Sequence, residues 1–155
     1  MTFLLGLVLS AMTAQAMPTI GDTAQYNYTI GAQKVAVTQK ITAFNSGANT
    51  YNILISANVN GRVINQNQSI EADKLITDAQ VDAILADCAG NGGTPMMVTV
   101  PAGTYQTCKL VQNDESGQPQ TIYIADNVAF GYVKANGTAQ GQTYMIDLVS
   151  SQMGR

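Results

Sequence analysis

The segment from Asp87 to Lys109 constrains the fold of this chain most, because it holds both cysteines of the sequence and a glycine-rich turn between them. Before this segment apolar residues repeat with helical spacing, and after it they alternate as they do in strands. Cys88 falls on the apolar stripe of the expected helix, and Cys108 lies in the middle of an expected strand beside Leu110. A bond between the two sulfurs would therefore pin a helix to a sheet.

Four segments before the helix alternate between apolar and polar residues, as half-buried strands do. They are expected at residues 24–30, 33–44, 50–59 and 62–71. Gly31-Ala32 and Asn60-Gly61 stand between two pairs of these segments and are typical of two-residue hairpin turns, which need positive φ angles. Hairpins join antiparallel neighbours, so this half of the chain is expected to form an antiparallel meander.

The period then changes from two to 3.6 residues, because apolar residues between Val81 and Cys88 recur at i, i+3, i+4 and i+7. Thr77 and Gln80 have the spacing of a capping box, so a helix is expected over residues 78–89. Further short strands are expected at residues 96–100, 104–112, 120–125, 129–134 and 143–149. The pattern predicts an α+β fold in which a single curved antiparallel sheet, a meander or half-barrel, packs around one central helix.

Residues 1–16 are expected to be a signal peptide. An uncharged, mostly apolar run extends from Phe3 to Met12, and Ala14-Gln15-Ala16 matches the A-x-A cleavage pattern, although the usual basic start is missing. The alternative is a buried or membrane-spanning helix, but a spanning helix needs about 20 apolar residues. No cysteine follows the cleavage site closely, which argues against a lipid anchor. We therefore expect a single β-rich domain at residues 17–155, periplasmic or secreted.

Export favours a disulfide between Cys88 and Cys108, because two cysteines in an exported protein usually pair. A metal site would need more ligands than two thiolates, and a redox pair is normally closely spaced, as in C-x-x-C. Closing a loop of this length is expected to contribute roughly 3 kcal/mol of stability.

Composition disfavours several classes of function. The chain has no histidine, which excludes Ser-His-Asp and Cys-His nucleophile pairs and nearly all zinc sites. The net charge is −3 with no basic run, so a nucleic-acid partner is not expected. Asp114-Glu115 lacks the oxygen-ligand spacing of a calcium loop. We therefore expect no enzymatic activity, no metal and no cofactor.

Three segments carry a resemblance to small exported proteins of Gram-negative bacteria. Residues 20–26 resemble their "GD-x-x-x-Y" opening, residues 98–110 their "V-P-A-G-T-[FY]-x-T-C-K" strand pair, and residues 122–134 their later "W-Y-x-P-x-V-P-x-G-x-V-K" segment. Most of those families have no known function. Their half-barrel shape is similar to that of the periplasmic lipoprotein-carrier superfamily, so the resemblance implies an exported half-barrel that binds a lipid.

Two functions remain open from the sequence. The first is a binding or carrier protein for a lipid or other apolar ligand, and the residues expected to line its concave wall are Ile53, Ile55, Val98 and Ile122. The second is a module for contact with an envelope protein, which would act through the Asn- and Gln-rich strand at residues 62–71. The pattern leaves open whether the helix fills the concavity or leaves a cleft.

Overall fold

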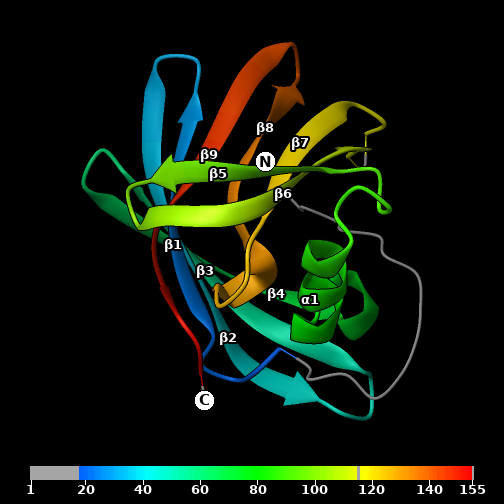
Figure 1. Ribbon diagram of the computed structural model, residues 1–155. Coiled ribbons are helices and arrows are strands. Elements are labelled where there is room, and N and C mark those ends of the chain that lie inside the picture. Colours follow the sequence, from blue (N-terminus) through cyan, green and yellow to red (C-terminus); the bar gives the residue numbers. More distant parts are fainter. Residues whose placement is uncertain (1–17, 115, 155) are drawn as a thin grey trace.

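Alternating residues and tight turns produce nine strands in the part of the chain that the computed structural model describes, residues 18–114 and 116–154 (Figure 1). The strands are β1 (Thr23–Ile30), β2 (Gln33–Asn45), β3 (Thr50–Val59), β4 (Arg62–Glu71), β5 (Thr94–Val100), β6 (Gly103–Asn113), β7 (Pro119–Ile124), β8 (Tyr132–Ala139) and β9 (Gln142–Gln152). One α-helix, α1 (Asp78–Ala86), and two short 3₁₀ turns, η1 (Ala72–Lys74) and η2 (Ala129–Gly131), complete this part of the chain.

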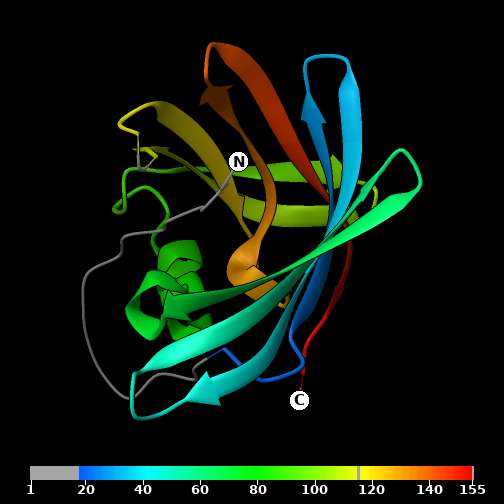
Figure 2. The ribbon, with the colours of Figure 1, turned by 180° about the vertical axis from the view of Figure 1, so that it is seen from behind.

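The strands form one open sheet in the order β4-β3-β2-β1-β9-β8-β7-β6-β5, and the paired strands are antiparallel. Hairpins account for most neighbours, as the turn signals predict: Asn60 and Gly61 have φ angles of 52° and 81°. The pairing of β9 with β1 is different, because it joins the two ends of the chain in the middle of the sheet (Figure 2). The sheet is therefore two meanders joined along β1 and β9.

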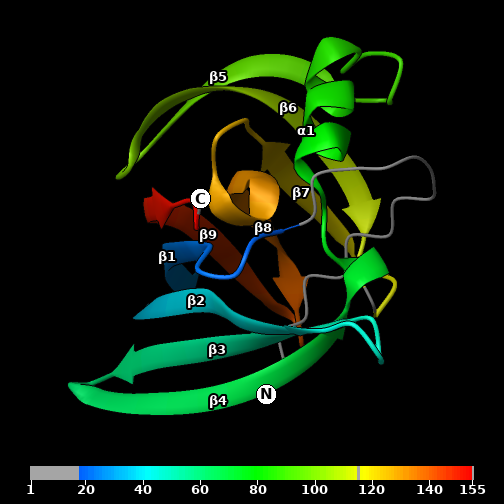
Figure 3. The same ribbon diagram turned by 90° about the horizontal axis from the view of Figure 1, so that it is seen from below.

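The sheet bends strongly, so that its two halves face each other (Figure 3). β5 and β6 lie on one side of the bend and β3 and β4 on the other, with η2 between them. Register shifts at Gln25/Tyr26, Ile41/Ala43 and Tyr123/Ile124 interrupt three of the ladders, and such bulges increase bending and twist. The curved antiparallel sheet expected from the sequence is confirmed.

The helix begins where the capping box predicts. The backbone N–H of Gln80 donates to Thr77 Oγ1 at 3.2 Å, and the N–H of Thr77 donates to Gln80 Oε1 at 2.8 Å. It ends at Ala86 rather than at residue 89, because Asp87 leaves the helical region with φ −137° and ψ 62°. The Asp87 carboxylate then accepts the N–H of Gly90 at 2.9 Å, which closes the following turn.

The helix is not the centre of the sheet, which corrects the expected packing. α1 buries Val81 and Ile84 and contacts β6 and β7, whereas most of the core consists of side chains from the sheet itself. The strand expected at residues 129–134 is also displaced. Residues 129–131 form η2, and β8 runs on to Ala139, where the sequence pattern indicated a loose segment.

Cys88 and Cys108 form the expected disulfide, with an S–S distance of 2.06 Å and a Cα–Cα distance of 5.6 Å. The bond ties the turn after α1 to the middle of β6. Within residues 18–114 and 116–154, no helix is long and apolar enough to cross a membrane. The expected signal peptide lies outside the described residues.

Candidate functional site

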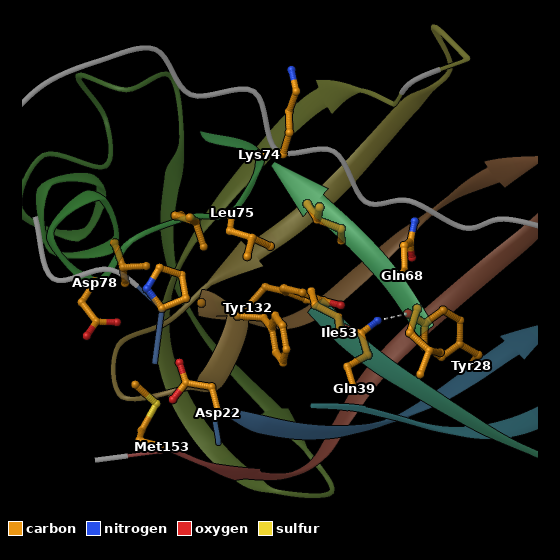
Figure 4. A pocket seen from close by; sticks show the side chains of 17 residues that line it. Asp22, Tyr28, Gln39, Ile53, Gln68, Lys74, Leu75, Asp78, Tyr132 and Met153 are labelled. Carbon is orange, nitrogen blue, oxygen red and sulfur yellow. Dashed lines mark hydrogen bonds between the residues drawn. The ribbon is translucent and has the colours of Figure 1, made fainter. Parts of the chain in front are cut away.

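A small cavity lies between the inner face of β1–β4 and the helical segments η1, α1 and η2 (Figure 4). Its volume is about 70 Å³. Small-molecule sites usually enclose about 300–1,000 Å³, so the cavity in this conformation holds a small group and not a whole lipid.

Most of the cavity wall is aliphatic or aromatic. Seven of the apolar residues that line it come from two strands, from the linker between η1 and α1, from α1 itself and from η2: Ile53, Ile55, Ile70, Leu75, Ile76, Val81 and Phe130. The strand residues reach the wall because alternate side chains of a strand point to the same face. The cavity therefore favours an apolar group.

One end of the cavity carries neutral polar groups. Gln39 Nε2 donates to the Tyr28 hydroxyl at 3.4 Å, and Gln68 lies close by (Figure 4). Burial raises the pKa of Tyr28 to about 12, although a hydrogen bond with Tyr132 opposes part of that rise. The phenol is therefore neutral at physiological pH and can donate or accept a hydrogen bond.

Charged groups in the lining have different roles. Asp22 is buried, and its carboxylate accepts the N–H of Thr19 at 2.9 Å and the N–H of Gly154 at 2.7 Å, so it ties the segment before β1 to the segment after β9. Lys74 is exposed, and its side chain extends away from the other labelled residues (Figure 4). Among the described residues that line the cavity, Lys74 is the one with a positive charge.

The backbone at η2 is unusual. Phe130 and Gly131 have φ angles of 66° and 72°. A methyl group on Gly131 would lie 2.8 Å from Ile76 Cγ2 and 2.9 Å from Val81 Cγ2, so glycine allows close packing against α1 and its preceding linker. Phe130 has no such freedom, and a non-glycine residue in the left-handed region costs about 1–2 kcal/mol. Strain of this kind concentrates at functional sites.

The structure brings two of the four expected lining residues to the cavity. Ile53 and Ile55 lie in its wall, and their contact with a ligand stays a prediction. Val98 and Ile122 do not line it, because they lie on β5 and β7 and are buried in the main core. Leu75 and Phe130 were not anticipated, since the alternation of strand residues gives no information about linkers.

Among the described residues, no cluster of three or more His, Cys, Asp or Glu side chains could hold a metal ion. Asp114 instead shapes a hairpin tip: its Oδ1 accepts the N–H groups of Ser116 and Gln118 at 2.8 and 2.9 Å.

The second candidate site is the free edge of β4. The N–H of Ala72, directly after β4, donates to the carbonyl of Asn49 at 2.9 Å, and the β3–β4 register continues from there without a shift. Because backbone groups alternate in direction along an antiparallel strand, odd-numbered residues of β4 point their N–H and C=O groups outward. We call this outward row the β4 edge; it comprises Val63, Asn65, Asn67, Ser69 and Glu71.

Between the charged residues at its two ends, Arg62 and Glu71, β4 lacks the features that usually protect an edge strand, which are charge, proline, bulges and short length. Residues 63–70 are uncharged and contain no proline. Within the described residues β4 pairs with β3 alone, and Figure 3 shows it as the outermost strand of its half. The opposite edge, β5, is shorter and carries Pro95, and the turn after it is held to β9 by a hydrogen bond from Ala102 N to Leu148 O at 3.1 Å.

An open, bent antiparallel sheet with a short helix is the fold of the YmcC-like and MucB-like proteins, to which this chain is similar in structure. A protein from Bacteroides fragilis, assigned as exported and YmcC-like, has a TM-score of 0.50 at 8% identity over 89% of this chain and 98% of its own. A protein from Parabacteroides distasonis, assigned as a lipoprotein, has a TM-score of 0.51 at 8% identity over 91% and 100% of the two chains.

MucB, solved in complex with MucA(peri), has a TM-score of 0.50 at 9% identity; the match covers 87% of this chain and 50% of MucB, so this chain spans about half of MucB. No family model and no curated protein matches the sequence. The similarity establishes the fold, and the sequence motifs of the exported families stay a prediction.

Proposed function

We propose that this chain is an exported, non-enzymatic protein-interaction module of the cell envelope, which binds an extended polypeptide along the β4 edge. A strand added there would satisfy the outward N–H and C=O groups of β4, and neighbouring side chains would give selectivity. The single observation that carries this proposal is a ten-residue edge strand whose central residues, 63–70, carry no charge and no proline, in a sheet whose other edge is short and contains a proline. The presence of a bound partner on MucB, a neighbour in fold, supports the same class of function.

Replacing Asn67 with proline is expected to reduce binding of a polypeptide partner at least tenfold. The N–H of Asn67 points outward, so proline removes a donor for the added strand and leaves the bonds to β3 in place. The measurement is the amount of a stoichiometric partner retained from envelope extract by immobilised protein.

The matched control is Asn67→Ser, which changes the same side chain and keeps the N–H. Both variants should retain wild-type circular dichroism and unfolding midpoints within a few degrees. Equal retention by the proline and serine variants would refute strand addition at β4.

A second candidate function is supported by the apolar cavity and by exposed Lys74 in its lining. This arrangement suits a short-chain carboxylate, because the cavity volume of about 70 Å³ admits only a few carbon atoms. Butanoate is expected to bind, and Ile55→Trp, which fills the cavity from β3, is expected to weaken that binding at least tenfold by calorimetry.

The matched control is Val111→Trp, because Val111 is 65% exposed on β6 and does not line the cavity. If both tryptophan variants bind butanoate equally, the cavity is not its site. If wild-type protein binds no butanoate, this second function is wrong.

A further inference from the structure

We infer that the strand added at the β4 edge is β4 of a second copy of this chain, which joins two sheets across a two-fold axis at Asn67. This inference rests on the proposed function and names its partner. It follows from which way each β4 residue faces and from the order of side chains along the strand.

The direction of the backbone groups restricts the possible registers. Odd-numbered residues of β4 point their N–H and C=O groups outward, so an antiparallel copy can pair odd residues only with odd residues. Asn67 opposite Asn67 of the second copy is such a register. It then places the five outward residues of each copy opposite one another, with about ten hydrogen bonds available between the strands.

The side chains on the inner face agree with this same register. Gln68 and Ile70 line the cavity, so the even-numbered residues of β4 face the inside of the bend. With Asn67 on the axis, Ile64 lies opposite Ile70 of the second copy, and Gln66 lies opposite Gln68. Ile64 is 53% exposed in the single chain, and this pairing covers it with an aliphatic partner.

Shifting the second copy by one allowed step in either direction loses this match. One shift places Ile64 opposite Gln68 of the second copy and Arg62 opposite Ile70. The other places Ile70 opposite Gln66 and Ile64 beyond the end of the second strand. Cross-strand pairs of like polarity stabilise a sheet, so the register centred on Asn67 is favoured.

The chemistry of the outer face also suits a second copy. In this register Asn65 lies opposite Ser69 of the second copy, and two Asn67 side chains meet on the axis. Because residues 63–70 are uncharged, the paired segments bring together no like charges.

Sedimentation equilibrium of the purified protein with its native disulfide intact tests this inference. The expected result is an average mass that rises toward twice that of the monomer as concentration increases. Asn67→Lys, which places two ammonium groups face to face on the axis, should weaken the association at least tenfold. Gln106→Lys adds the same charge at an exposed position of β6 and should leave it unchanged.

Cysteine cross-linking identifies the register in which the two β4 strands pair. Asn67→Cys should form a covalent dimer on oxidation, since Cα atoms of opposite residues in a hydrogen-bonded pair lie about 5.5 Å apart. Gln66→Cys should cross-link far less, because it faces Gln68 of the second copy. A protein that stays monomeric at all concentrations, or Gln66→Cys dimers in excess of Asn67→Cys dimers, would overturn the inference.

Failure of the dimer and failure of strand addition are distinguishable. If the protein is monomeric but Asn67→Pro abolishes binding of a different polypeptide, strand addition at β4 stands and the inference of a dimer is wrong. If the protein is monomeric and Asn67→Pro leaves capture of its partner unchanged, both the proposed function and the dimer are wrong.

Discussion

Replacing Cys88 and Cys108 together with alanine is expected to lower the free energy of unfolding by about 3 kcal/mol. The disulfide joins residues 20 positions apart, and in the chain-entropy model a loop of that length contributes about 3 kcal/mol by restricting the unfolded chain. Both residues are buried, and alanine leaves only small gaps. Guanidinium unfolding of the wild type and the double variant measures the difference.

Dithiothreitol provides the internal control for this experiment. It should destabilise the wild type by a similar amount and should leave the double-alanine variant unchanged. A double variant as stable as the oxidised wild type would show that the pairing of helix and sheet does not depend on the disulfide.

A substitution at Gly93 tests how much the packing around the two sulfur atoms contributes to stability. A methyl group on Gly93 would overlap Cys108 Sγ and would lie 2.8 Å from Cys88 Sγ. Gly93→Ala should therefore destabilise the wild type more than it destabilises the double-alanine variant, in which both sulfurs are absent. The two differences form a double-mutant cycle for this contact.

Local features of this fold were predictable because their causes are local. Asn60-Gly61 forms its tight turn since both residues accept positive φ angles, and Thr77 with Gln80 starts the helix through bonds three residues apart. The disulfide was predictable because two cysteines have one way to pair, and the sequence predicts export, which favours that pairing.

Features that depend on distant segments were not predictable in the same way. Nothing local indicates that β9 pairs with β1 and so joins two meanders into one bent sheet. That bend determines which inward-facing residues line the cavity. Ile53 and Ile55 reach it, whereas Val98 and Ile122 are buried in the main core. The left-handed backbone conformation of Phe130 was not predicted either, because the residue pattern at 129–134 is that of a strand.

The Asn- and Gln-rich segment at residues 62–71 shows how a sequence pattern gains meaning from its place in a fold. In the sequence it could be the hydrated side of an ordinary strand. The sheet order places it at a free edge, and the register fixes which of its backbone groups are outward. An edge strand whose central residues are uncharged can pair with a further strand, so the identity of its partner is the most informative result to obtain.

Raising the pH above 10 is expected to destabilise the protein steeply, because three buried tyrosines line the interior. Tyr26 and Tyr132 stack with ring centroids 4.8 Å apart, and Tyr28 packs edge-on against Tyr26 at 6.5 Å. Burial raises the pKa of Tyr28 to about 12 and raises the pKa values of Tyr26 and Tyr132 well above 10.

The sign follows from proton linkage. A tyrosine in the unfolded chain loses its proton near pH 10, whereas the folded protein keeps its buried phenols protonated. Above pH 10 the unfolded state therefore binds fewer protons, and the free energy of unfolding falls as pH rises. Each buried tyrosine contributes a slope of about 1.4 kcal/mol per pH unit, so three together give about 4 kcal/mol per unit between pH 10 and 12. Below pH 10 these groups contribute no pH dependence.

Tyr28→Phe separates this effect from the titration of lysines, because it keeps the ring and removes one phenol. Denaturant unfolding from pH 8 to 11.5 should show a constant difference between wild type and variant below pH 10. Above pH 10 the wild type should lose about 1.4 kcal/mol per pH unit relative to the variant, since only the wild type must keep this phenol protonated to stay folded. A difference that stays constant through pH 11.5 would mean that the Tyr28 hydroxyl reaches water in the folded protein, and the polar end of the cavity would then be open to solvent.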